Sequence, residues 1–204
     1  MSLIETVDIA LAGVGGQGSV LAGRIVARAA EIDGRKVATS EVHGMSQRGG
    51  SVFSTVRYGP EEVLSPMIPQ GEADVLLAFE RLESLRYLTY VAQGGIVVVN
   101  DQRLAPPLES LKAAAYPDNV AGILRYHTDR VWMVPGLDRA DRLGNPKLAN
   151  TVTLGALSAQ LDLGLPSWRQ ALCELVPPQT VDLNLAAFEA GIAWAEAEHS
   201  ARAA

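Results

Sequence analysis

The segment VDIALAGVGGQG, residues 7–18, decides the fold class of this 204-residue chain. Its first half is short and mostly apolar, which is typical of a strand buried inside a parallel sheet. Its second half places Gly13, Gly15 and Gly18 in the pattern G-x-G-x-x-G. Apolar residues then recur every three or four positions from residue 21 to residue 32, as on one face of a helix. A strand, a glycine turn and a helix over residues 19–33 predict the start of an α/β sheet.

The rest of the chain continues this alternation. We expect further strands at residues 37–42, 51–58, 73–79, 96–99 and 131–134. We expect helices at 82–91, within 108–126, at 147–161, at 167–175 with Ser167 as N-cap, and from Asp182 onward, with residues 198–204 frayed. Strands that alternate with helices favour a mainly parallel sheet. The prediction is one three-layer, Rossmann-like α/β domain over residues 1–204, with a helical C-terminal third.

Composition excludes several classes of protein. Lys and Arg number 17 against 23 Asp and Glu, and the net charge of −6 disfavours general nucleic-acid binding, which needs basic patches. The single cysteine, Cys173, excludes an internal disulfide, a cysteine zinc site and an iron–sulfur cluster held by this chain alone. We expect Cys173 to be a small buried helix residue. His43, His127 and His199 lack metal-ligand spacing, so no metal site is expected.

The first residues and the apolar runs of the sequence bear on where the protein is expected to reside. The first eight residues have no basic region followed by an apolar run, and the longest clean apolar run, residues 96–99, is far too short to span a bilayer. We therefore expect a cytoplasmic protein without a membrane segment.

The glycine segment has a clear chemistry in principle. Glycines let the backbone approach a phosphate, and a helix N-terminus offers free N–H groups. Glu41 lies where a ribose-binding acid of a dinucleotide site would be expected. Against a dinucleotide site, Gln17 is long and polar, and no hydride-transfer residues follow. A tight strand–helix turn without a ligand is the plain alternative.

A second dense motif, SEVHGMSQRGGSV, occupies residues 40–52. Arg48 can fork onto a phosphate or a carboxylate, and Gly49 and Gly50 allow close backbone approach. The plain alternatives are a surface ion pair between Arg48 and Glu41, and a turn histidine at His43.

Together the two motifs resemble the gamma domain of the 2-oxoacid:ferredoxin oxidoreductases, in particular those that act on indolepyruvate. Four further stretches share this resemblance: FERLESLRY (79–87), GGIVVVN (94–100), NTVTLGAL (150–157) and NLAAFEAG (184–191). The resemblance covers nearly the whole chain, with least support at 104–126. It implies oxidative decarboxylation of an arylpyruvate or other 2-oxoacid, with coenzyme A and ferredoxin, to an acyl-CoA and carbon dioxide.

The resemblance also implies a division of labour. Thiamine diphosphate, Mg²⁺ and 4Fe-4S clusters would reside in a large alpha subunit, and ferredoxin would act through the complex. This chain would hold no cofactor and no catalytic residue, and would complete the coenzyme A site or the subunit interface of a heteromer. Two alternatives stay open: a stand-alone NAD(P)-binding oxidoreductase and a non-enzymatic binding module of the same fold. The candidate binding residues are Gly13, Gly15, Gly16, Gln17, Gly18, His43, Ser46, Gln47, Arg48, Gly49, Gly50, Asn100 and Asn150.

Overall fold

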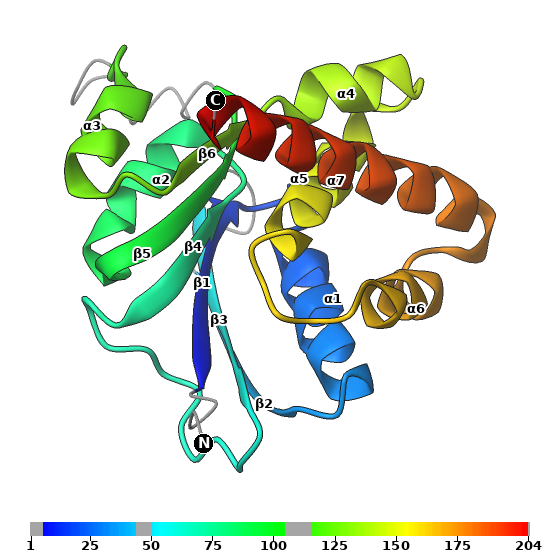
Figure 1. Ribbon diagram of the computed structural model, residues 1–204, viewed down its shortest axis with the longest axis horizontal. Coiled ribbons are helices and arrows are strands. Elements are labelled where there is room, and N and C mark those ends of the chain that lie inside the picture. The colour runs from blue at the N-terminus through cyan, green and yellow to red at the C-terminus, as the bar shows by residue number, and fades with distance from the viewer. Residues whose placement is uncertain (1–5, 44–49, 105–115, 204) are drawn as a thin grey trace.

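The computed structural model describes residues 6–43, 50–104 and 116–203 as a layered α/β fold (Figure 1). The strands are β1 (Val7–Val14), β2 (Lys36–His43), β3 (Ser51–Gly59), β4 (Ala73–Ala78), β5 (Val91–Asn100) and β6 (Val131–Val134). The α-helices are α1 (Ser19–Ile32), α2 (Arg81–Arg86), α3 (Val120–His127), α4 (Gly136–Arg142), α5 (Ala149–Ser158), α6 (Leu165–Leu175) and α7 (Val181–Ala203). Short 3₁₀ turns are η1 (Leu88–Tyr90), η2 (Pro146–Leu148) and η3 (Pro178–Thr180).

The six strands form one sheet in the order β2-β3-β1-β4-β5-β6. β1, β4, β5 and β6 pair in parallel, whereas β3 is antiparallel to both of its neighbours. β3 runs in the opposite direction because the chain returns from β2 directly into its neighbour in the sheet, and the two strands pair antiparallel along the whole of β2. The expected α/β class with a mainly parallel sheet is confirmed.

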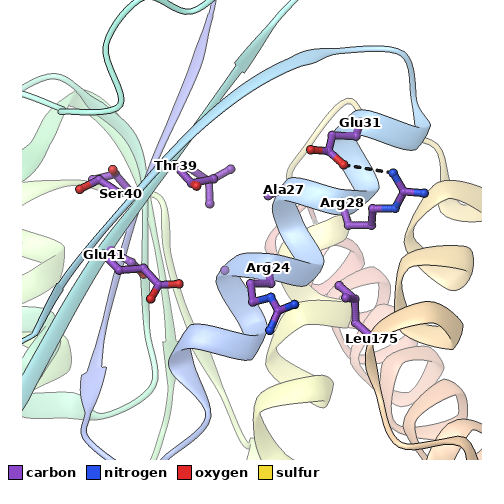
Figure 2. A pocket seen from close by; sticks show the side chains of 12 residues that line it. Arg24, Ala27, Arg28, Glu31, Thr39, Ser40, Glu41 and Leu175 are labelled. Atoms are coloured by element: carbon purple, nitrogen blue, oxygen red, sulfur yellow. Dashed lines mark hydrogen bonds and ion pairs between the residues drawn. The ribbon is translucent and has the colours of Figure 1, made fainter. Parts of the chain in front are cut away.

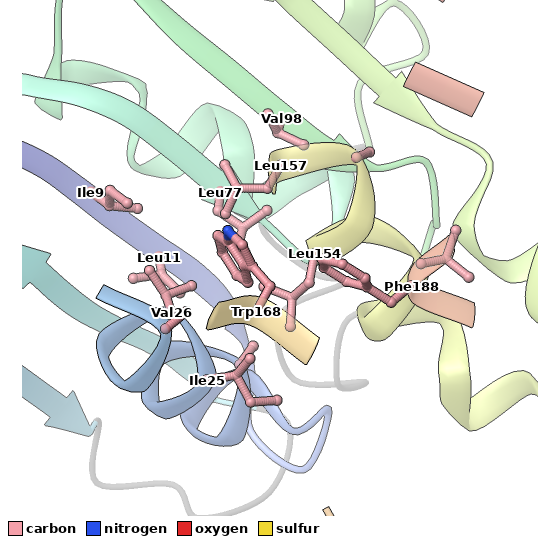
Figure 3. Packing of buried hydrophobic residues seen from close by; sticks show 14 of the residues in the cluster. Ile9, Leu11, Ile25, Val26, Leu77, Val98, Leu154, Leu157, Trp168 and Phe188 are labelled. Atoms are coloured by element: carbon pink, nitrogen blue, oxygen red, sulfur yellow. The ribbon is translucent and has the colours of Figure 1, made fainter. Parts of the chain in front are cut away.

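Helices cover both faces of this sheet and make three layers. On β1, Ile9 and Leu11 face a large core under α1, α5, α6 and α7, while Ala10 and Ala12 face a smaller core under α2 and α3. Figure 3 shows the large core, in which the fully buried Trp168 belongs to the same cluster as residues of β1, β4 and β5. Successive side chains of a strand point to opposite faces, so β1 presents branched side chains to the large core and alanines to the smaller one.

The helical C-terminal third is confirmed, and its tightest contact is between α5 and α7. Gly155 on α5 lies directly against Gly191 on α7, and a Cβ on either glycine would overlap a backbone carbonyl oxygen of the other helix. The two glycine-containing stretches at 150–157 and 184–191 are therefore a helix–helix contact.

Several expected boundaries were wrong. The helix expected over 82–91 ends at Arg86, and β5 begins at Val91 because a bulge at residues 92–95 extends the pairing with β4. The helix α4 was not expected. The helix expected at 147–161 ends at Ser158, and α7 begins at Val181, so Asp182 lies inside its first turn.

Two helix ends in the C-terminal third also differ from expectation. α6 begins after Gly164, while Ser167 lies inside the helix and donates its hydroxyl to Asp33 Oδ1 at 2.9 Å. Residues 198–203 are helical, since Arg202 donates to the Val131 carbonyl at 2.6 Å and stacks over the Trp132 ring at 4.1 Å.

Cys173 is exposed, contrary to expectation. On α6, Trp168, Ala171 and Leu172 face the core, which turns the next position along the helix outward. Within the described ranges, no helix is both long and apolar enough to cross a membrane.

Candidate functional site

The carboxyl ends of β1 and β4 meet at the point where the chain changes sides of the sheet. α1 follows β1 onto one face, and α2 follows β4 onto the other. In open α/β sheets, ligands bind in the crevice at such a switch point. Here that position is occupied by the glycine segment, residues 13–18, and by the residues that follow β4.

Glycine is needed at different positions of this segment for different structural reasons. Gly16 (φ 94°) and Gly18 (φ 82°) adopt left-handed backbone conformations and are exposed; a Cβ would meet open space at Gly16 and only an ordinary contact with Asn150 Nδ2, at 3.9 Å, at Gly18. Gly13 instead packs closely, because a Cβ there would lie 3.2 Å from Ser19 and 3.3 Å from Phe79. Gly18 is also the N-cap of α1, and no side chain in the described ranges caps this helix, so its first N–H groups are open to water or a ligand.

Two side-chain amides hold the glycine segment in shape. Gln17 accepts a hydrogen bond from the Val14 N–H at 2.7 Å and donates to the Phe79 carbonyl at 3.2 Å. Asn150, in the first turn of α5, donates to the Gln17 carbonyl at 2.6 Å. Both candidate binding residues therefore brace the loop, and their amide groups are engaged within the chain.

The second motif meets the first at its ends. The Gly15 N–H donates to the Gly50 carbonyl at 2.7 Å, and Ser51 pairs opposite Val14 at the start of β3. His43 ends β2 opposite Val52. The remaining candidates Ser46, Gln47, Arg48 and Gly49 lie outside the described residues, as does the alternative ion pair of Arg48. The two motifs are thus brought together from positions some thirty residues apart in the sequence.

Two buried carboxylates lie beside these loops, and sequence reasoning missed both. Glu80 is the N-cap of α2 and accepts hydrogen bonds from the backbone N–H groups of Leu82 and Glu83 at 2.6 and 3.1 Å. Its other oxygen accepts the Tyr116 hydroxyl at 2.6 Å. Burial, together with this carboxylate, raises the pKa of Tyr116 above its usual range. The signal was available, since FERLES places two acidic residues directly after an apolar strand.

Glu83 connects α2 to the second motif. Its side chain accepts a hydrogen bond from the Ser51 hydroxyl and forms an ion pair with Arg86, whose Nε lies 3.2 Å from Glu83 Oε1. The Ser51 hydroxyl also lies 2.9 Å from the Tyr87 hydroxyl.

Asn100 is buried at the carboxyl end of β5, and β4 separates it from the glycine segment. Its Nδ2 donates to Gln102 Oε1 at 3.2 Å, and its Oδ1 has no hydrogen-bond partner among the described residues. The neighbouring Asp101 forms a 2.5 Å ion pair with Arg81, the first residue of α2. Asn100 therefore belongs to the same edge of the sheet but does not contact the glycine segment through any hydrogen bond in the described ranges.

Glu41 does not occupy the position of a ribose-binding acid. β3 lies between β1 and β2, which places Glu41 two strand spacings, about 10 Å, from β1. Instead, Glu41 lines a pocket of about 240 Å³ between α1 and strands β2 and β3, with Arg24 on the opposite wall (Figure 2). This arrangement weakens the dinucleotide interpretation of the glycine pattern. In the three described ranges, no three His, Cys, Asp or Glu side chains are grouped so that they could hold a metal ion.

Comparison with known proteins gives a consistent picture. The family model described as pyruvate ferredoxin/flavodoxin oxidoreductase matches residues 8–194. The chain is 40% identical over 192 residues to the indolepyruvate oxidoreductase subunit IorB of Thermococcus kodakarensis, covering 91% of this chain and 94% of the relative.

Solved structures agree on the fold. The keto/oxoacid ferredoxin oxidoreductase gamma subunit from Geobacter sulfurreducens matches with a TM-score of 0.70 and 28% identity, over 94% of this chain and 99% of that one. The 2-oxoglutarate:ferredoxin oxidoreductase from Magnetococcus marinus, solved with 2-oxoglutarate, coenzyme A and succinyl-CoA bound, matches with a TM-score of 0.74 and 22% identity. That match covers 95% of this chain but 31% of the other, so the same fold is there one part of a longer polypeptide.

Proposed function

Because the chain belongs to the pyruvate ferredoxin/flavodoxin oxidoreductase family, we propose that it is the gamma-type subunit of a 2-oxoacid:ferredoxin oxidoreductase, with indolepyruvate or another arylpyruvate as substrate. The observation that carries this proposal is the 40% identity to an indolepyruvate oxidoreductase subunit over nearly the full length of both chains. A relative of matching length that is itself a subunit argues for a subunit here.

The reaction needs groups that this chain is not built to hold. The complex would oxidise the 2-oxoacid, release carbon dioxide, transfer the acyl group to coenzyme A and pass the electrons to ferredoxin. Clusters of the 4Fe-4S type need several cysteine thiolates, and this chain has one cysteine. The clusters would therefore reside in another subunit, and the family resemblance implies that this is a large alpha subunit that also holds thiamine diphosphate and Mg²⁺, so we expect the isolated chain to be inactive.

The loops at the β1–β4 switch point would complete the coenzyme A site or the subunit interface. Gly16 and Gly18 expose backbone next to the uncapped N-terminus of α1, where a phosphate group of coenzyme A fits the free N–H groups and the helix dipole. Arg48, in the adjoining motif, would pair with a phosphate or with the substrate carboxylate. Gln17 and Asn150 would support this site by bracing the loop.

The test is to co-express this chain with its alpha subunit and to compare Arg48→Ala with Arg125→Ala, a change at an exposed arginine on α3. We expect Arg48→Ala to raise the KM for coenzyme A or to weaken assembly by tenfold or more, since a charge-assisted contact contributes about 1.5–3 kcal/mol. Arg125→Ala should leave both unchanged. Unchanged turnover, coenzyme A dependence and assembly in Arg48→Ala would refute this role.

The partner itself can be identified by purifying the tagged chain from its native host. We expect a large, cysteine-rich, thiamine-binding subunit to co-purify. Binding of NAD(P) by the isolated chain, with hydride transfer, would favour the stand-alone oxidoreductase instead. Absence of both results would favour a binding module of the same fold.

A further inference from the structure

A buried carboxylate, that of Glu83, lies next to the two motifs and has no role in the proposed function. Glu83 in α2 is 4% exposed. Its Oε2 accepts the Ser51 hydroxyl, and its Oε1 faces Arg86 Nε at 3.2 Å. Burying a carboxylate is costly unless hydrogen bonds and charges satisfy it. The Arg86 side chain is 55% exposed, whereas the hydrogen bond between Ser51 and Glu83 is partly buried.

The direction of the hydrogen bonds at Ser51 can be assigned. A carboxylate only accepts, so the single hydroxyl hydrogen of Ser51 is donated to Glu83. The Tyr87 hydroxyl, 2.9 Å from Ser51 Oγ, must then donate to it. The Tyr87 ring is itself held in place, because it stacks on Phe53 with ring centroids 4.6 Å apart and planes 10° apart. A chain of donors therefore runs from Tyr87 through Ser51 to Glu83.

Ser51 is the residue through which this chain of hydrogen bonds reaches the loops. It is the last residue but one of the second motif, begins β3 and pairs opposite Val14, the last residue of β1. Its neighbour Gly50 accepts the 2.7 Å hydrogen bond from the Gly15 N–H. A shift of Ser51 would move the Gly50 carbonyl and break the link between the two motifs.

We propose that Tyr87 and Glu83 are positioning residues for the coenzyme A site, and that they hold the second motif against the glycine segment through Ser51 and Gly50. This inference rests on the proposed function, because the loops are the ones assigned there to coenzyme A. Neither side chain touches the ligand; both act through Ser51.

The test compares Tyr87→Phe with Tyr90→Phe. Tyr90 belongs to the same aromatic group, with its ring centroid 4.7 Å from that of Phe53, but its hydroxyl makes no hydrogen bond within the described part of the chain. Each change removes one hydroxyl and leaves the ring. We expect hydrogen exchange at the Gly15 amide, measured by NMR on the full chain, to become about fivefold faster in Tyr87→Phe, since one hydrogen bond is lost. We expect no change in Tyr90→Phe.

The assembled complex supplies the second measurement. Tyr87→Phe should raise the KM for coenzyme A about fivefold and leave kcat within about twofold, as expected when a binding loop is misplaced. Glu83→Gln, which keeps an acceptor for Ser51, should give a smaller effect than Glu83→Ala.

The outcomes separate the two claims. Unchanged exchange at Gly15 in Tyr87→Phe, or an equal change in Tyr90→Phe, overturns the positioning role whatever the kinetics. Faster exchange in Tyr87→Phe alone, combined with unaltered coenzyme A kinetics and assembly, overturns the assignment of coenzyme A to these loops while the anchoring of the loops stands.

Discussion

Two pairs of glycines in this chain are needed for different reasons. Gly16 and Gly18 have left-handed backbone conformations, and a Cβ at either position would meet no atom closer than 3.9 Å. Gly155 and Gly191 have ordinary helical backbones and no space at all, since each lies against the backbone of the other helix. The first pair is glycine because of its φ angle, and the second because of its neighbours.

The difference teaches how far a glycine-rich motif can be interpreted from sequence. The pattern G-x-G-x-x-G attracts attention because it is compact, whereas Gly155 and Gly191 lie 36 positions apart (191 − 155) and form no local pattern. Yet the distant pair carries the greater steric constraint. The loop is braced by two side chains, Gln17 within the pattern and Asn150 on α5 outside it.

The largest effect is expected at the helix crossing. In Gly191→Ala, the new Cβ would overlap the Val152 carbonyl oxygen, which belongs to the backbone of α5 and cannot turn away. The helices must separate and loosen the packing around Phe188, so we expect a loss of about 3 kcal/mol or more in the free energy of unfolding. Urea titration followed by circular dichroism measures this loss. Gly155→Ala should behave alike, and a loss below about 1 kcal/mol in either variant would show that the helices adjust readily.

A smaller and purely conformational effect is expected at Gly18. Gly18→Ala meets no atom closer than 3.9 Å, but its Cβ is strained at φ 82°. We expect a loss of about 1–2 kcal/mol in the free energy of unfolding. Gly18→Asn should lose less, because asparagine tolerates the left-handed region better. Equal losses for alanine and asparagine would point to a steric cause and would remove the contrast with Gly191.

Much of the fold could be predicted from local pattern. The buried strand before the glycines, the helix to Ile32 and its stop at Gly34 all follow from periodicity and turn chemistry, and the structure has them. The wrong expectations depend on contacts that no window of sequence contains. Residues 198–203 remain helical because Arg202 reaches β6, and Cys173 is exposed because the position of Trp168 sets which face of α6 turns inward.

The candidate site, like the fold, could be predicted from the sequence only in part. Residue types placed both motifs at the ends of strands, and in the structure the Gly15–Gly50 hydrogen bond joins the two motifs. The antiparallel β3 between β1 and β2 could not be foreseen, and it moves Glu41 away from the glycine segment. The buried partner of the second motif, Glu83, was also missed, because burial of a carboxylate is decided by tertiary packing.

The brace on the loop allows a third, smaller test. Asn150→Ala removes the 2.6 Å hydrogen bond to the Gln17 carbonyl. We expect a loss of about 1 kcal/mol in the free energy of unfolding, with faster amide exchange confined to the glycine segment and the start of α1. Asn145→Ala, which removes a contact to the nearby Lys147 N–H, is the matched control and should leave the glycine segment unchanged. Exchange that rises across the α5–α7 contact as well would mean that loop and crossing are not independent.

The smallest effect, and one of opposite sign, is expected at Gly23 in the middle of α1. This glycine is buried and helical, as Gly191 is, but a Cβ there would lie 3.6 Å from Ser54 Oγ and 3.8 Å from Leu11 Cδ2, which are ordinary contacts. Gly23→Ala should therefore raise the free energy of unfolding by about 0.5–1 kcal/mol, because alanine loses less conformational entropy in a helix. The change would also narrow the pocket of Figure 2, which Gly23 lines. Urea titration beside Gly191→Ala gives a direct comparison of two helical glycines that differ in the space around them. If Gly23→Ala instead destabilised the chain, a buried helical position would require glycine even without a close backbone neighbour. The steric explanation for Gly155 and Gly191 would then fail, and only the explanation of Gly16 and Gly18 by their φ angles would stand.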